Sequence, residues 1–109
     1  MCKFKSWYFD DNGYVLQCQT CSRYQVSYGT TMLTLNNNDF HNFTSIVFKT
    51  KENNPPVNNA TIKCVVLPTP SSCVSSILTQ YELDNLYYML QEVDTEMKVE
   101  HLLGLFNPS

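Results

Sequence analysis

The sequence predicts an α+β fold with two layers, a mostly antiparallel sheet and two helices packed on one face of that sheet. Three observations support this class. Segments rich in Tyr, Phe, Val and Ile with strand-like spacing occupy residues 3–35 and 60–78. Two other segments carry apolar residues at helical spacing behind a capping residue. Turn-forming residues, rather than crossover helices, join most of the strands, and such connections favour antiparallel neighbours.

A β-hairpin opens the chain. Residues 3–9 are rich in aromatic side chains and form the first predicted strand, and residues 14–18 form the return strand. Between them stands Asn12-Gly13, which is a strong signal for a two-residue turn. With the turn at these residues, Trp7 faces Cys18 across the hairpin.

Two further extended segments follow, and then the period changes. Residues 24–28 alternate between apolar and polar side chains, as a half-buried strand does. Gly29 interrupts the pattern as a bulge or bend, and residues 31–35 continue it. The first predicted helix is capped by Asn36 and ends near Lys51. Its apolar stripe consists of Phe40, Phe43, Ile46 and Val47.

The second half of the chain has the same order of elements. Residues 60–67 and 73–78 are predicted strands on either side of a Pro-rich turn. A shift of the sequence that places Leu35 on Leu78 also places Cys21 on Cys64. Each half then has the order strand, strand, capped helix, which indicates a ββα pseudo-repeat. The alternative is that any junction between a strand and a capped helix gives this likeness.

The second predicted helix begins at a capping box formed by Thr79 and Glu82. Its first apolar stripe consists of Leu83, Leu86, Leu90, Val93 and Met97. A second stripe lies almost opposite the first and consists of Val99, Leu102, Leu103 and Phe106. Either the helix breaks near residues 94–96, or it runs on with its far face covered. If it is unbroken, the second stripe cannot reach the same core, which favours a homodimer.

Composition limits the class of function. A chain of 109 residues predicts a single domain over residues 1–109 with one core. Charged residues make up 16%, well below the usual quarter, whereas there are seven Tyr and six Phe. A surface so poor in charge favours a homodimer or a protein partner. A net charge of −3 with only seven Lys and Arg argues against nucleic-acid binding and against a membrane surface.

The location expected from the sequence is the cytoplasm. No stretch approaches the ~18 consecutive apolar residues of a membrane span, and the N-terminal residues lack the apolar centre of a signal peptide. Five Cys is an odd number, and in a reducing compartment the default states are the thiol and the metal thiolate. The cysteines are therefore candidates for a metal site.

Cys18 and Cys21 form the only Cys-x-x-Cys of the chain. The predicted hairpin places Cys2 at the same end of the sheet, so three thiolates can converge and one more ligand would complete a structural zinc site. We expect Cys64 to be the fourth ligand, with Cys73 and His41 as weaker candidates. Two alternatives stay open: thiols in a sheet and its turn without a metal, or a redox pair. A thioredoxin-like pair sits at a helix N-terminus, however, whereas this one precedes a strand.

Catalytic signatures are absent from the sequence. It has no Gly-x-Ser-x-Gly elbow and no glycine-rich nucleotide loop. The neighbours Glu100 and His101 are a poor acid–base candidate. The aromatic residues of the strands favour cross-strand packing over base stacking, because the positive charge that a nucleic-acid site needs is missing. The predicted function is a non-catalytic binding or adaptor module that works through an aromatic, charge-poor face; the alternative is a thiol redox protein or sensor centred on the Cys-x-x-Cys.

Several short motifs resemble those of a family of small uncharacterised Bacteroidota proteins, a domain of unknown function. The motifs are Asn12-Gly13-Tyr14-Val15, Cys18-x-x-Cys21, Val26-Ser27-Tyr28-Gly29, the segment from Leu35 to Phe40, and Leu78-Thr79-x-x-Glu82-Leu83. The resemblance covers nearly the whole chain and implies a cytoplasmic single-domain protein with a Cys-x-x-Cys. Cys18 and Cys21 match the family pattern, whereas Cys2, Cys64 and Cys73 do not clearly belong to it. The family supplies no activity.

Overall fold

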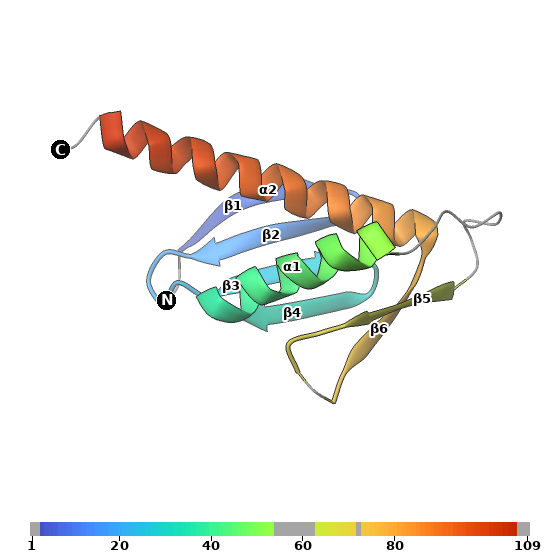
Figure 1. Ribbon diagram of the computed structural model, residues 1–109. Coiled ribbons are helices and arrows are strands. Elements are labelled where there is room, and N and C mark those ends of the chain that lie inside the picture. The colour runs from blue at the N-terminus through green and yellow to red at the C-terminus, as the bar shows by residue number, and fades with distance from the viewer. Residues whose placement is uncertain (1–2, 54–62, 72, 107–109) are drawn as a thin grey trace.

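The computed structural model describes residues 3–53, 63–71 and 73–106, and its helices and strands form an α+β fold (Figure 1). The fold class is confirmed, with one difference: the strands form two antiparallel sheets instead of one. Strands β1 to β4 make a four-stranded sheet in the order β1-β2-β3-β4, and β5 and β6 make a separate hairpin. The elements are β1 (Phe4–Asp10), β2 (Gly13–Cys18), β3 (Tyr24–Tyr28), β4 (Thr31–Leu35), α1 (Asn37–Asn53), β5 (Lys63–Pro68), β6 (Ser75–Thr79) and α2 (Gln80–Phe106).

The first hairpin turns one residue earlier than the sequence predicts. Asp10 pairs with Gly13, so Asp11 and Asn12 form the loop. The cause is the Asp10 side chain, whose Oδ1 accepts hydrogen bonds from the backbone N–H groups of Asn12 and Gly13 at 2.7 and 3.1 Å. Gly13 is needed for a different reason from the predicted turn: a Cβ there would lie 2.0 Å from the carbonyl oxygen of Ser27 on β3. Glycine thus permits close contact between β2 and β3.

A β-bulge also changes the register of β1 against β2. The pairing shifts between Ser6 and Tyr8, which leaves Trp7 as the extra residue. Beyond the bulge Phe4, and not Trp7, pairs with Cys18, so the predicted pairing of Trp7 with Cys18 is wrong. The Trp7 side chain packs against the core instead, and its Nε1 donates to the Oε1 atom of Gln17 at 3.0 Å.

The remaining strands and the first helix follow from local signals. Tyr28 pairs with Thr31, so Gly29 is the first residue of a tight turn, and its φ of 55° is the left-handed conformation that glycine adopts without strain. Asn36 caps α1 as predicted, because its Oδ1 accepts from the Asp39 N–H at 2.8 Å.

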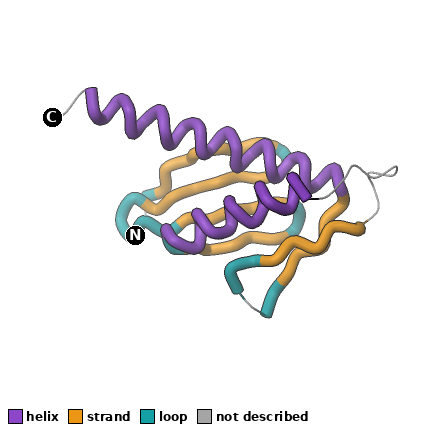
Figure 2. The backbone as a smooth tube through the Cα atoms, in the orientation of Figure 1, coloured by secondary structure: helices purple, strands orange, loops and turns teal. Residues whose placement is uncertain are grey.

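Both helices pack on one face of the four-stranded sheet, and this inner face forms the core (Figures 1 and 2). Ring stacking joins α1 to β3: Tyr24 lies 4.1 Å from Phe40 and Tyr28 lies 5.9 Å from Phe43, measured between ring centroids. Helix α2 packs across β1 and β2, and β5–β6 packs against both helices. The buried Tyr28 hydroxyl is hydrogen-bonded to Ser76 Oγ at 2.7 Å, which ties the two sheets together.

Helix α2 begins at the predicted capping box and runs unbroken for 27 residues, or about 40 Å. The Glu82 N–H donates to Thr79 Oγ1 at 3.0 Å, and the Thr79 N–H donates to Glu82 Oε1 at the same distance. The first apolar stripe is buried as far as Val93. Val99 lies two and a half turns beyond Leu90 and so points away from the core. The structure therefore selects the unbroken helix from the two alternatives.

The order strand, strand, capped helix is present in both halves, as β3-β4-α1 and as β5-β6-α2. The two helices begin at corresponding positions, Asn37 and Gln80. The two strand pairs belong to different sheets, however, so any internal symmetry is limited to the order of elements. No helix within the described residues is long and apolar enough to cross a membrane.

Candidate functional site

The turn between β2 and β3 brings Cys18 and Cys21 together. The Cys21 N–H donates to Cys18 Sγ at 3.4 Å, and the Ser22 N–H donates to the Cys18 carbonyl oxygen at 2.9 Å. Ser22 has a φ of 62°, a left-handed conformation that closes the turn. Cys18 is buried, whereas Cys21 is exposed.

The other predicted zinc ligands are placed as follows. Cys2 and the side chain of Cys64 lie outside the described residues. Lys3 accepts a backbone hydrogen bond from the Gln19 N–H at 2.8 Å, so the described chain begins against the cysteine turn. Cys64 belongs to β5. The preceding residue, Lys63, forms an ion pair with Glu82.

That ion pair lies at the other end of the four-stranded sheet. Glu82 Oε2 would be 3.3 Å from a Cβ on Gly29, which belongs to the turn opposite the cysteine turn. Five residues of β3 separate the two turns, a length of about 17 Å. The structure therefore does not bring the beginning of β5 to the cysteine turn. Among residues 3–53, 63–71 and 73–106, no three His, Cys, Asp or Glu side chains are grouped closely enough for a metal. The zinc site stays a prediction.

The weaker ligand candidates and the acid–base candidates lie apart from this turn. His41 is exposed on α1, and Cys73 is exposed before β6. Glu100 forms an ion pair with Lys5 of β1, across the inner face, and His101 is exposed beside it. Lys5 Nζ also lies 4.1 Å from the centroid of the Trp7 ring, in cation–π geometry. The ion pair between Glu100 and Lys5 thus connects α2 to β1.

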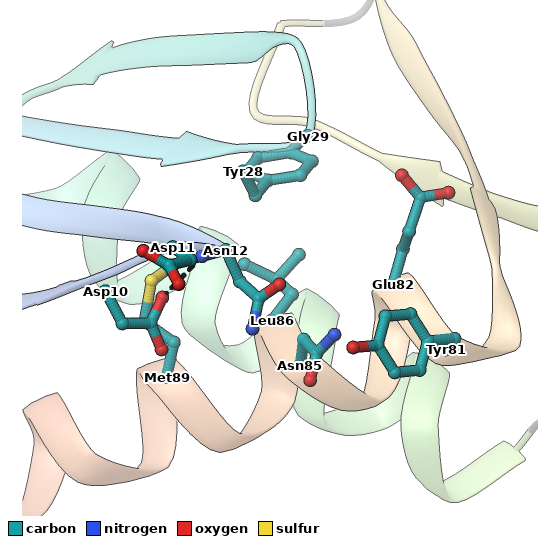
Figure 3. A pocket seen from close by; sticks show the side chains of 10 residues that line it. All are labelled: Asp10, Asp11, Asn12, Tyr28, Gly29, Tyr81, Glu82, Asn85, Leu86 and Met89. Carbon is teal, nitrogen blue, oxygen red and sulfur yellow. Dashed lines mark hydrogen bonds between the residues drawn. The ribbon is translucent and has the colours of Figure 1, made fainter.

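A hollow of about 270 Å³ opens between the first hairpin turn, the Gly29 turn and the beginning of α2 (Figure 3). Figure 3 shows Glu82 extending toward Gly29 on one side and Asp10 and Asp11 on the other. Two hydrogen bonds lower the pKa of Glu82: the larger effect comes from the Lys63 side chain, and the next comes from the Thr79 N–H. These partners belong to the helix cap and to β5, so contacts within the chain explain the lowered pKa of Glu82 and no ligand is needed to explain it.

The Asp10 carboxylate in this hollow is also engaged locally. It accepts a hydrogen bond from the Tyr8 hydroxyl, which raises the pKa of Tyr8 to about 12 and lowers the pKa of Asp10. Desolvation raises the pKa of the buried Tyr24 and Tyr28 as well. All of these shifts move away from neutral pH, whereas an acid–base catalyst needs a pKa near the working pH.

The sequence predicts an aromatic, charge-poor face but does not locate it, and the face of the four-stranded sheet that points away from the helices has this character. We call it the outer sheet face. Side chains at alternate strand positions form it: Phe4, Ser6, Phe9, Tyr14, Leu16, Gln25, Ser27, Met32 and Thr34. None of the nine is charged. Period-2 alternation identifies these positions once the bulge at Trp7 is known, because its extra residue exchanges the two faces of β1 on its N-terminal side.

The end of α2 forms a second uncovered apolar surface. We call it the α2 end, and it consists of the exposed residues Val99, Leu102, Leu103 and Leu105. Figure 1 shows these last turns extending away from the sheet. Three members of the second stripe, Val99, Leu102 and Leu103, are thus exposed in a single chain, and Leu105 broadens the surface, whereas the side chain of Phe106 lies outside the described residues.

Comparison with known proteins gives a family without an activity. A protein-family model with the description "Family of unknown function (DUF6686)" matches residues 1–105. No curated protein and no solved structure is significantly similar to the chain. The match agrees with the expectation of a family of unknown function, whereas restriction to Bacteroidota and a shared Cys-x-x-Cys motif stay predictions.

Proposed function

The chain belongs to the DUF6686 family of unknown function, and from this premise we propose that it is a small non-catalytic binding or adaptor module that acts through contacts with proteins. One observation supports the proposal: among the described residues, the outer sheet face and the α2 end are both apolar and uncovered, and they lie on opposite layers. The outer sheet face belongs to the strand layer, and the α2 end belongs to the helix layer. Two separate surfaces are what an adaptor needs to hold two partners at once.

The composition of the surfaces supports a protein as the partner. Interface centres are depleted in charged residues and enriched in Tyr, Phe and Met. The outer sheet face has this composition, with Phe4, Phe9, Tyr14 and Met32 among its members. A nucleic acid would require basic side chains, and this face offers none. A location in the cytoplasm, where thiols stay reduced, is part of the proposal.

Photo-crosslinking in cells of the source organism tests the proposal. A benzophenone amino acid replaces Met32 on the outer sheet face, Leu103 on the α2 end or, as a control, the exposed His41 of α1. We expect discrete protein adducts from Met32 and Leu103 and none from His41. The Met32 adduct should weaken or disappear when Phe9→Glu is introduced on the same face. No adduct at either surface, or the same adducts from all three positions, would contradict the proposal.

A further inference from the structure

We propose that the outer sheet face is the interface of a homodimer, in which two copies of the chain pack sheet against sheet about a two-fold axis. This inference rests on the proposed binding function and names the occupant of one of its two surfaces. The argument starts from a row of side chains that crosses the whole sheet.

The row follows the strand register from edge to edge. Phe9 pairs with Tyr14, Tyr14 with Ser27, and Ser27 with Met32. The rings of Phe9 and Tyr14 stack with centroids 5.8 Å apart and planes at 15°. The Tyr14 hydroxyl reaches across the small Ser27 and lies 3.5 Å from Met32 Sδ. These contacts hold the larger side chains in one ordered surface before any partner binds.

The row remains exposed in the single chain. Phe9 is 74% exposed and Met32 is 53% exposed. The solvent face of an antiparallel sheet is normally polar, so that apolar and polar residues alternate along each strand. Here the alternation places Phe, Tyr, Leu and Met on the open face, without a charge. An exposed apolar patch of this kind marks a binding surface.

Charge favours a second copy as the occupant. A two-fold interface places the same patch of both subunits together, so any charge on it faces its own copy. The chain has a net charge of −3, so two copies carry charge of the same sign and repel each other at long range. The outer sheet face avoids that repulsion because none of its residues is charged.

The α2 end is a poorer choice for self-association. The C-terminal part of α2 carries Glu92, Asp94, Glu96 and Glu100, and the two ion pairs of Lys98 with Asp94 and of Lys5 with Glu100 leave a net negative charge there. Pairing two copies along this helix would bring an excess of negative charge together. The α2 end is therefore left for a different partner.

The size of the patch sets the strength of the dimer. Strands of five to seven residues about 4.8 Å apart give the four-stranded sheet a footprint of roughly 350 Å². Specific interfaces bury about 800 Å² of accessible surface per partner, so this interface belongs to the small class. Aligned packing of two twisted sheets, at about −30°, suits such a face. We expect a dissociation constant on the order of 10 μM.

Sedimentation equilibrium of the full-length protein up to about 200 μM tests the dimer. The test variants are Phe9→Glu and Met32→Glu, and the controls are Val66→Glu on the exposed side of β5 and Leu102→Glu on the α2 end. Met32 and Leu102 are both 53% exposed, so the two substitutions disturb the monomer equally little. The wild type should dimerise, and each test variant should weaken the dimer by about tenfold or more, because the two-fold symmetry places two added carboxylates in the interface. The controls should stay within about twofold of the wild type.

The outcomes separate this inference from the proposed function. A wild type that stays monomeric at the highest concentration, or a dimer that Leu102→Glu disrupts and Met32→Glu does not, overturns the homodimer. Circular dichroism of each variant shows whether the fold is retained; if both test variants unfold, Thr34→Lys on the same face replaces them and should give the same weakening. Crosslinking from Met32 to another protein instead of a second copy overturns the homodimer alone. Loss of all adducts in the crosslinking experiment overturns the binding module itself.

Discussion

At the scale of single residues, Asp10 accepts several hydrogen bonds from its neighbours in the chain. Its carboxylate caps the first hairpin turn and also accepts a hydrogen bond from the Tyr8 hydroxyl. Because the pKa of Tyr8 is raised to about 12, this contribution to stability is complete below the unfolded value of about 10 and is lost as pH rises through 12. Because the pKa of Asp10 is lowered, its contribution is present above about 3.9 and is lost as pH falls through the folded value.

Asp10→Asn tests this pair, since the amide oxygen keeps the cap but the charged acceptor is removed. We expect a loss of less than about 1 kcal/mol in the free energy of unfolding, because the site is exposed. The difference from wild type should be constant between about pH 5 and 9 and should shrink beyond both limits. Denaturant unfolding across pH measures it. Asp11→Asn, which removes the same charge from the same turn, is the control. If the loss of unfolding free energy in Asp10→Asn did not change with pH, the stabilising role of the Tyr8–Asp10 pair would be contradicted.

The cysteine turn gives the second prediction at this scale. If the protein binds a metal, we predict zinc held by Cys2, Cys18, Cys21 and Cys64, because thiolates are soft ligands and four of them close the site. Elemental analysis of protein purified without added metal should find about one equivalent, and Cys21→Ser should remove most of it. Cys73→Ser is the control and should change nothing. Less than about a tenth of an equivalent in the wild type would leave the turn without a metal role.

The same elemental analysis also tests the choice of Cys64 as the fourth ligand. The beginning of β5 lies at the end of the sheet opposite the cysteine turn, where Lys63 meets Glu82. Zinc that persists in Cys64→Ser and disappears in Cys21→Ser would keep the metal and move the fourth ligand elsewhere.

At the scale of elements, α2 has two unequal halves. The first half fills the core with Leu83, Leu86 and Leu90, whereas the α2 end is exposed. Ending the chain after Lys98 should therefore cost little stability, about 0–1 kcal/mol, mainly through loss of the exposed Lys5–Glu100 ion pair. Leu90→Ala should cost about 2–5 kcal/mol by comparison. Thermal unfolding followed by circular dichroism measures both, and equal losses would mean that the α2 end is part of the core.

At the scale of the whole molecule, the sequence predicts the elements better than their assembly. The caps at Asn36 and at Thr79 with Glu82 depend on neighbouring residues, so both helix starts could be predicted. The first turn was placed one residue too late, because the Asn12-Gly13 signal was preferred to the Asp10 side chain that caps the observed turn. The close approach of Gly13 to Ser27 on another strand could not be predicted, because it depends on how β2 and β3 pair. The separation of β5–β6 from the main sheet also arises from packing against both helices, which spacing along the chain does not encode.

The same distinction applies to the candidate site. Cys18 and Cys21 were predicted to lie together because their contact is local. The outer sheet face was hidden by the bulge at Trp7, since its extra residue exchanges the two faces of β1 on the N-terminal side of the bulge. A regular strand would place Lys5 and Trp7 on the same side as Phe9, whereas the bulge places Phe4 and Ser6 there. With the bulge in place, Phe4 falls on the same side as Phe9, Tyr14 and Met32, and the uncharged composition of the face becomes visible in the sequence.

The consecutive order of strands β1 to β4 has a kinetic consequence. Each strand pairs with its neighbour in sequence, and two of the three connections are two-residue loops, so the four-stranded sheet can close stepwise through contacts of short separation. Contacts between β1 and α2, such as that of Lys5 with Glu100, span nearly the whole chain and carry a larger loop-closure entropy. The meander should therefore nucleate early and α2 should dock late. During that interval both faces of the sheet are open, and the nascent chain is most prone to aggregate before its last helix arrives.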